Sequence, residues 1–173
     1  MICDPEEVGF GLHRMTPPAL RGDFQDLTAW RQGVVEVLDL ALRGQHGPVI
    51  APMTVVRPAY FEEIIGTLRD RGHDVRHFAL LAPREVVVER LRGRGLGLGL
   101  GFESWAVRAL DGCLEALPDG RFAVHVDIAN RSVSETADLV AASCGLTIRQ
   151  DTDGPWRGKL RRAAVGVRHL RMP

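Results

Sequence analysis

The sequence predicts an α/β fold in three layers, with a parallel β-sheet covered by helices on both faces. Short and nearly continuous apolar runs occur at 49–56, 75–81 and 123–128, which is the pattern of strands buried on both sides of a sheet. Stretches with apolar residues at three- and four-residue steps, typical of amphipathic helices, lie between these runs. Strands that alternate with helices favour a parallel sheet with right-handed crossovers.

The elements follow in a regular order. Residues 1–3 read as the end of a strand, and Asp4-Pro5 begins a helix. Later helices are indicated by apolar positions at helical spacing. These positions are Leu27, Trp30, Val34, Val37, Leu38 and Ala41; then Phe61, Ile64, Ile65 and Leu68; then Val86, Val87, Arg90 and Leu91; then Phe102, Trp105, Ala106, Ala109, Leu110, Cys113, Leu114 and Leu117. Ser132 and Glu135 have capping-box spacing and predict the start of the last helix of the domain, which Gly145 ends.

Composition limits the classes of function. The chain has 173 residues, 45% of them apolar and 25% charged, which suits one globular domain. Its formal net charge is zero, so no overall field favours nucleic acid as a partner. Three cysteines and six histidines show no disulfide or metal-ligand spacing, and we expect small buried cysteines and no metal site. The sequence shows no signal-peptide core and no membrane-spanning run, so a cytoplasmic setting is the default expectation.

A change of character near residue 148 divides the chain. Residues 1–148 form the predicted domain, and a linker-like stretch at 147–155 leads into a basic tail within 149–173. Residues 156–171 place apolar residues on one helical face and arginines over much of the rest. This pattern fits a helix that lies on a membrane surface. It also fits a terminal helix that packs on the domain with its charges in solvent, and both interpretations stay open.

A glycine-rich segment at 93–101 follows a predicted helix and not a strand. Neither GxxxxGK[ST] nor GxGxxG can be placed on it, so it does not predict a phosphate-binding loop. Glycine at every second position makes ordering costly in entropy. We therefore expect this segment to act as a flexible lid.

Several motifs in a fixed order resemble those of the tunicamycin-resistance ATP-binding protein family. They are Asp4-Pro5-Glu6-Glu7-Val8-Gly9, Asp23-Phe24-Gln25-Asp26 with Trp30-Arg31, Pro52-Met53-Thr54-Val55-Val56 with Pro58 and Tyr60-Phe61, Arg90-Leu91-Arg92-Gly93-Arg94-Gly95, Trp105 with Asp111 and Cys113, and Asp127 to Ser132. The resemblance implies a P-loop domain of the nucleoside-monophosphate-kinase type over 1–148, ATP with Mg²⁺ as cofactors, and a tail that reaches the membrane.

The sequence departs from that family at its start. No apolar strand with a GxxxxGK[ST] loop precedes Asp4, so we expect a sheet that lacks its first, central strand and the Walker A loop. Losing a central strand leaves buried backbone groups unpaired, at about 1–3 kcal/mol each. A start codon misplaced downstream of the true start is one expectation and a truncated gene is the other, and the chain as printed is expected to be poorly folded.

Ligands of parallel α/β sheets bind beyond the carboxyl ends of the strands, which singles out particular residues. Asp4 follows a strand and is a candidate catalytic carboxylate for a substrate hydroxyl, or a helix cap. Arg31, Arg57 and Thr54 are candidate substrate-binding residues near the mouth of the site, although the arginines fit surface positions as well.

Arg90 and Arg94 flank the glycine-rich lid. They are candidate phosphate ligands because a planar guanidinium suits bidentate contact, and the alternative is a solvated helix end.

The resemblance implies a protein that resists tunicamycin by ATP-linked binding of the drug or of a related nucleoside compound. One alternative is a small-molecule kinase with Asp4 as base and with Arg90 and Arg94 on the transferred phosphoryl group. A second alternative is a non-catalytic remnant that keeps only its basic tail. Whether the chain is an enzyme stays open at this point.

Overall fold

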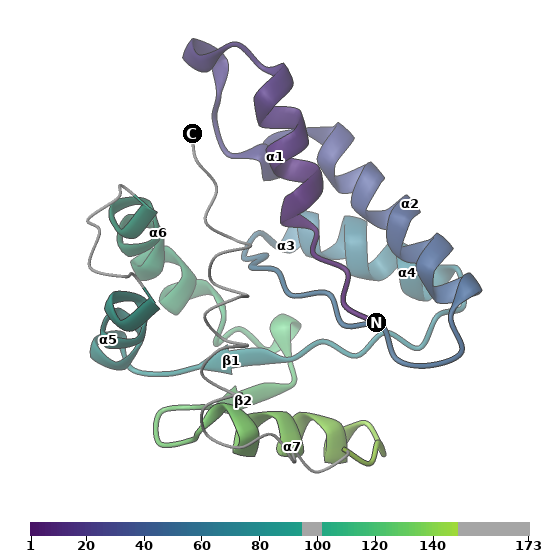
Figure 1. The fold of residues 1–173 in the computed structure, drawn as a ribbon, viewed down its shortest axis with the longest axis vertical. Coiled ribbons are helices and arrows are strands. Elements are labelled where there is room, and N and C mark those ends of the chain that lie inside the picture. The colour runs from purple at the N-terminus through teal and green to yellow at the C-terminus, as the bar shows by residue number, and fades with distance from the viewer. Residues whose placement is uncertain (95–101, 149–173) are drawn as a thin grey trace. The chain divides into compact units, whose positions relative to one another are not determined.

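The computed structural model describes residues 1–94 and 102–148, with the side chains at 93–94 and 102–108 left undescribed. The predicted lid at 93–101, apart from its first two residues, and the basic tail at 149–173 therefore lie outside the described residues. The chain divides into two compact units (Figure 1). Unit 1 holds Met1–His77 and Glu115–Val124, and unit 2 holds the remaining residues.

Unit 1 is built from helices. α1 spans Glu6–Met15 and α2 spans Thr28–Gly44. A third helical stretch joins α3 at Pro58–Phe61, a π-helical turn at Glu62–Gly66, and α4 at Thr67–Asp70. Pro58 suits the first turn of α3 because its fixed φ is already helical and its missing N–H needs no partner there. Gly72, with φ of 87°, takes the left-handed conformation just beyond α4.

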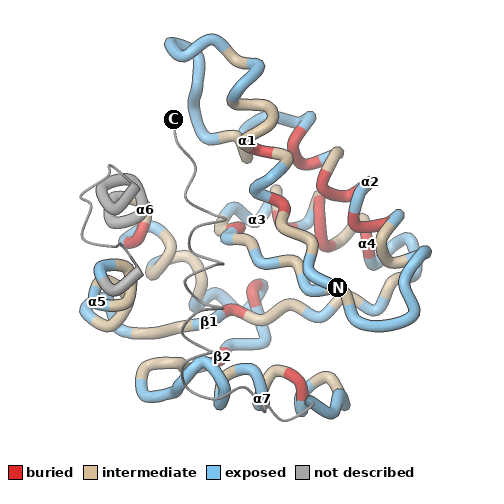
Figure 2. The backbone as a smooth tube through the Cα atoms, viewed as in Figure 1, coloured by how far each residue is buried: buried red, intermediate tan, exposed pale blue. Residues whose placement is uncertain are grey.

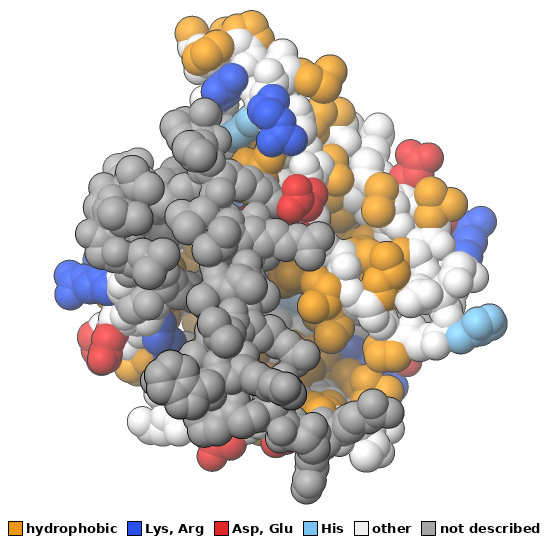
Figure 3. All heavy atoms as spheres, viewed as in Figure 1, with side chains coloured by type: hydrophobic (Ala, Val, Ile, Leu, Met, Phe, Trp, Pro, Cys, Tyr) orange, Lys and Arg blue, Asp and Glu red, His pale blue; other side chains and the backbone are white. Residues whose placement is uncertain are grey.

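The core of unit 1 lies between α2 and the α3–α4 stretch. Its largest fully buried side chains are Trp30, Phe122, Ile64, Leu68 and Val34. Figure 2 shows buried positions along α2 and α4 in red. The prediction for Val37 was wrong, because its side chain is 50% exposed and Val35 is buried instead. The stripe that α2 buries is centred on the side of Arg31 and Leu38, which places Val37 just beyond its edge. Hydrophobic side chains also reach the surface where α1 ends, at Met15 and Leu20 (Figure 3).

Unit 2 contains a parallel pair of strands with helices. β1 spans Ala79–Leu81 and β2 spans His125–Asp127, with Leu80 opposite Val126. α5 spans Arg84–Arg94, α6 spans Phe102–Ala116 and α7 spans Val133–Ser143. The predicted capping box of α7 is confirmed, since the Glu135 N–H donates to Ser132 Oγ at 3.2 Å and the Ser132 N–H donates to Glu135 Oε2 at 2.7 Å.

The α/β class is confirmed, but the strands are shorter and more exposed to solvent than predicted. The run at 49–56 forms only an isolated parallel bridge, in which Ile50 pairs with Ile2. Ile50 is 59% exposed and Leu80 is 48% exposed, so the prediction of burial on both faces was wrong at these positions. Burial on both faces requires a wider sheet with helices over each side. Among the described residues, unit 1 has one isolated bridge and unit 2 has one pair of strands.

None of the helices within 1–94 and 102–148 is long and apolar enough to cross a bilayer.

Candidate functional site

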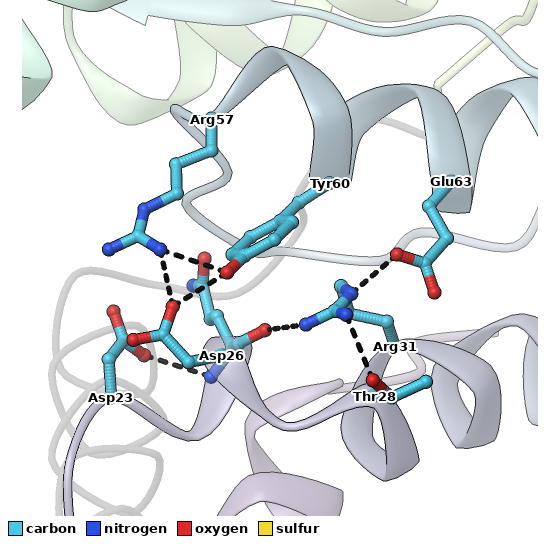
Figure 4. A network of polar contacts seen from close by, with 8 residues as sticks. Asp23, Asp26, Thr28, Arg31, Arg57, Tyr60 and Glu63 are labelled. Carbon is cyan, nitrogen blue, oxygen red and sulfur yellow. Dashed lines mark hydrogen bonds and ion pairs between the residues drawn. The ribbon is translucent and has the colours of Figure 1, made fainter.

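A network of charged and aromatic side chains joins the turn before α2 to the start of α3 (Figure 4). We call Asp26, Arg31, Arg57 and Tyr60 the arginine–tyrosine cluster. Asp26 Oδ1 accepts two hydrogen bonds, one from Arg57 Nη1 at 2.5 Å and one from the Tyr60 hydroxyl at 2.7 Å. The same Arg57 nitrogen donates to the Tyr60 oxygen at 2.9 Å. A cation, a carboxylate and a phenol therefore meet at one point.

Arg31 forms the buried end of this cluster. Its Nε donates to Glu63 Oε2 at 2.5 Å, its Nη1 to the Gln25 carbonyl at 2.6 Å, and its Nη2 to Thr28 Oγ1 at 3.2 Å. The Arg31 side chain is only 10% exposed, and its guanidinium carbon lies 4.3 Å from the centre of the Tyr60 ring. Because its own hydrogen bonds fix the guanidinium, Arg31 supports the face of the Tyr60 ring that it contacts.

Arg57 forms the open end. Its side chain is 57% exposed, and the Asp26 side chain is 48% exposed. The hydrogen bond to Tyr60, followed by the nearby Asp26 carboxylate, raises the pKa of Arg57, so the guanidinium stays charged. At this end, a ligand would meet the N–H donors of a guanidinium beside the oxygen acceptors of a carboxylate. Both groups are held by contacts within the protein.

Thr54 joins the network through its backbone. The Gln25 side chain donates from Nε2 to the Thr54 carbonyl at 2.8 Å. The structure thus brings together the predicted substrate-binding residues Arg31, Arg57 and Thr54. Sequence reasoning missed Asp26 and Tyr60, although both stand inside motifs that carried the family resemblance. No local pattern could show that they meet.

Asp4 lies at the start of α1. Its Oδ1 accepts the Glu6 N–H at 3.0 Å, so the capping role expected for Asp4 is confirmed. The indole Nε1 of buried Trp30 donates to the Pro5 carbonyl at 3.0 Å and fixes this helix end against α2. The catalytic role of Asp4 stays a prediction.

Arg90 belongs to unit 2 and contacts backbone oxygens. Its Nη2 lies 2.7 Å from the Ile128 carbonyl and 3.3 Å from the carbonyls of Ala129 and Arg131. In this arrangement Arg90 holds the loop that follows β2 against α5. The Arg94 side chain lies outside the described residues, and a phosphate role for either arginine stays a prediction.

Comparison with known proteins identifies the family. Neither a scan against family models nor a search of curated proteins gives a match. Among solved structures, that of the Deinococcus radiodurans tunicamycin resistance protein matches with a TM-score of 0.71. It shares 32% sequence identity, and the match covers 87% of this chain and 85% of that chain.

This chain belongs to the tunicamycin resistance protein family. The resemblance inferred from the motifs is confirmed at that level.

The family resemblance implies ATP and Mg²⁺ as cofactors, but this chain offers few ligands for them. In the described part of the chain, no group of three His, Cys, Asp or Glu side chains could hold a metal ion. The sequence has no GxxxxGK[ST] motif, whose backbone N–H groups and lysine would hold phosphates. ATP and Mg²⁺ therefore stay predictions that rest on the family resemblance.

A second polar network lies beside a groove in unit 1. The groove has a cavity volume of about 610 Å³ and lies along α2 and the α3–α4 stretch. Its lining residues are Gln32, Val35, Glu36, Asp39, Leu40, Glu63, Thr67 and Arg71.

Asp39 is 6% exposed, and its partners are one histidine and two arginines. It accepts from His73 Nε2 at 2.7 Å, from Arg43 Nη2 at 2.9 Å and from Arg71 Nη1 at 3.0 Å. The His73 hydrogen bond, together with both arginines, lowers the pKa of Asp39. Because its bonds join α2 to the end of α4, we interpret Asp39 as a structural residue.

Proposed function

We propose that this member of the tunicamycin resistance protein family binds tunicamycin, or a related nucleoside compound, at the arginine–tyrosine cluster. The observation that carries the proposal is that Arg57 and Tyr60 both donate to Asp26, while buried Arg31 contacts the Tyr60 ring. The solved family member is named for tunicamycin resistance, and the motifs that carry the resemblance contain these residues.

The chemistry of the cluster suits a nucleoside. Nucleosides carry ring carbonyl acceptors, ring N–H donors and sugar hydroxyls. The exposed guanidinium of Arg57 can donate to a ring carbonyl, and the exposed carboxylate of Asp26 can accept from a ring N–H or a hydroxyl. Because the protein already holds both groups in place, little side-chain entropy is lost when a ligand binds.

Equilibrium dialysis of the full chain with tunicamycin tests this proposal. Tyr60→Phe removes the hydroxyl that touches both Asp26 and Arg57 and keeps the ring against Arg31. We expect a folded variant whose affinity falls about tenfold, since one hydrogen bond to charged partners is lost. Unchanged affinity in Tyr60→Phe would place the drug elsewhere.

ATP binding is a separate proposal that drug binding does not require. The resemblance assigns ATP and Mg²⁺ to a three-layer kinase-like domain with a phosphate-binding loop, and the lid arginines Arg90 and Arg94 are the residues to substitute. Titration of the chain with ATP and Mg²⁺, compared with Arg94→Gln, tests it. If Arg94→Gln binds ATP as tightly as the unsubstituted chain, Arg94 does not contact the phosphates and the lid has no role in ATP binding.

The kinase alternative has one supporting observation. Ile2 and Ile50 pair in parallel, so the segments that follow them, which carry Asp4 and Thr54, leave at the same edge. A drug hydroxyl at that edge would have a carboxylate available as base. Mass spectrometry of tunicamycin incubated with the chain and ATP separates the alternatives: an added phosphoryl group supports a kinase, and unmodified bound drug supports binding alone.

Contact of residues 156–171 with a membrane surface also stays a proposal. Anionic vesicles incubated with the full chain, and with a chain ending at residue 148, test it. A chain that binds vesicles through this tail but binds neither drug nor ATP would support the remnant interpretation.

A further inference from the structure

We propose that the connection between α1 and α2, residues 14–21, is a docking surface for an anionic lipid membrane. We call it the Met15–Leu20 loop. It lies in unit 1 and shares no residue with the arginine–tyrosine cluster or with the C-terminal tail. The proposal concerns where the protein works and does not depend on drug binding.

The first observation is an exposed apolar tip. Met15 is 82% exposed and Leu20 is 74% exposed. The residues between them at 17–19, two prolines and an alanine, are exposed as well. Figure 3 shows these hydrophobic side chains gathered where α1 ends. Single exposed apolar residues are ordinary, but a contiguous group at the end of one loop indicates an interaction site.

The second observation is that the loop satisfies much of its own backbone. The N–H of Thr16 donates to the carbonyls of Leu12 and His13, and the N–H groups of Leu20 and Arg21 donate to the carbonyls of Pro17 and Pro18.

Side chains complete this bonding. Arg21 Nε donates to the Thr16 carbonyl at 3.0 Å, and His13 Nε2 donates to the Gly22 carbonyl at 2.9 Å. Pro17 and Pro18 have no N–H to satisfy. A loop with few open backbone groups can enter the apolar side of a membrane interface at low cost.

The third observation is the charge around the tip. Arg14 and Arg21 are exposed at either end of the loop, and His13 lies beside them. The sequence contains no carboxylate between Glu7 and Asp23, although the whole chain has a formal net charge of zero. Apolar side chains framed by arginines complement a bilayer, whose anionic headgroups lie outside its acyl chains.

A rigid base carries the loop. The Phe24 ring packs against Phe10 at 5.8 Å, His13 at 5.3 Å and Trp30 at 5.4 Å between ring centres. Gly9 permits this packing, because a Cβ atom there would lie 2.5 Å from Phe24 Cδ2. The base of the loop is therefore held by ring packing, which reduces the entropy lost when the loop binds.

Co-sedimentation of the full chain with vesicles tests the proposal, using phosphatidylcholine alone and phosphatidylcholine mixed with phosphatidylglycerol. The tail is present in every variant, so its contribution is constant. We expect Met15→Ser/Leu20→Ser to bind anionic vesicles about tenfold more weakly. Arg14→Gln/Arg21→Gln should also bind them about tenfold more weakly, with the difference fading at high salt.

Matched controls lie in unit 2. Val133 is 83% exposed on α7, and Arg92 is exposed on α5. Val133→Ser and Arg92→Gln should bind vesicles like the unsubstituted chain. All substituted positions are exposed, so the variants should fold, which circular dichroism and thermal melting check. Loop variants that bind like the controls would overturn the proposal, and so would a protein partner that requires this loop in the absence of lipid.

Insertion is measured directly with Leu20→Trp. Lipids brominated on their acyl chains should quench the added tryptophan more than they quench the unsubstituted chain. Quenching no greater than in the unsubstituted chain would show that the loop does not enter the bilayer and would overturn the proposal.

Discussion

The guanidinium of Arg31 lies against the ring of Tyr60, 4.3 Å from its centre, and so connects α2 to α3 through the candidate site. Arg31 also donates to Glu63, which lies in the π-helical turn directly after α3. Turns of this kind often occur at functional sites. The same residue therefore supports the fold of unit 1 and the position of Tyr60.

Arg31→Lys should destabilise the protein by about 2 kcal/mol or more. A lysine ammonium cannot reproduce the fork of bonds to Glu63, Gln25 and Thr28, and it would leave part-buried acceptors without their partner. Urea denaturation measures the loss. Arg57→Lys is the matched control, since this exposed arginine should change the midpoint little. Equal shifts of the urea midpoint in Arg31→Lys and Arg57→Lys would contradict the buried role of Arg31.

Phe122→Ala should cost about 3–5 kcal/mol of unfolding free energy, because it leaves a cavity in the core of unit 1. Phe122 is 1% exposed, and its ring centre lies 5.3 Å from that of Phe61 in an edge-to-face contact. Denaturant titration followed by tryptophan fluorescence measures the change. Val124→Ala, at a position 51% exposed, should cost far less. A small effect at Phe122 would mean that this core is not formed.

Asp39 should make the protein sensitive to acid. Its pKa is lowered in the folded state, so its contribution to stability is present above the unfolded pKa near 3.8 and is lost as the pH falls through the folded value. Thermal melts from pH 7 down to about pH 3 should show this loss. Asp39→Asn should melt several degrees lower at pH 7 and change less on acidification.

Asp138→Asn is the comparison for Asp39, because Asp138 is exposed on α7. It should melt like the unsubstituted chain at every pH. If the melting temperatures of Asp39→Asn and of the unsubstituted chain fall by the same amount as the pH is lowered, the role given to Asp39 is contradicted.

Ser132→Ala should cost about 1 kcal/mol, since it removes the side chain that caps α7. The hydrogen bonds with Ser132 also lower the pKa of Glu135. Guanidinium denaturation measures the change. Ser134→Ala, two positions further along, changes a serine outside the capping box and should have little effect. If the two variants lose the same stability, the capping box contributes nothing specific.

Local patterns predicted the helices better than the strands. The stripe from Trp30 to Leu38 and the Ser132–Glu135 box depend on near neighbours in the sequence, and the structure contains both helices. The run at 49–56 was predicted as a strand, yet only Ile50 pairs there, because strand pairing requires partners distant in the chain. The three cysteines were expected to be buried and are half-buried, with burial raising the pKa of Cys113.

The candidate site was predicted only in part, for the same reason. Thr54 and Arg57 were selected by their places beyond a predicted strand, and Arg31 by its place in a family motif near the presumed mouth of the site. The contact between Asp26 and Tyr60 joins residues 34 positions apart. It depends on how the turn before α2 packs against α3, and no sequence spacing encodes that packing.

Calorimetric titration of the full chain with tunicamycin, compared with Arg57→Gln and Arg121→Gln, tests the central claim most directly. Arg121 pairs with Asp119 on the surface of unit 1 much as Arg57 pairs with Asp26. We predict saturable binding by the unsubstituted chain and by Arg121→Gln, and binding about tenfold weaker or more by Arg57→Gln. No binding by the folded chain, or equal affinity in all three proteins, would contradict the account.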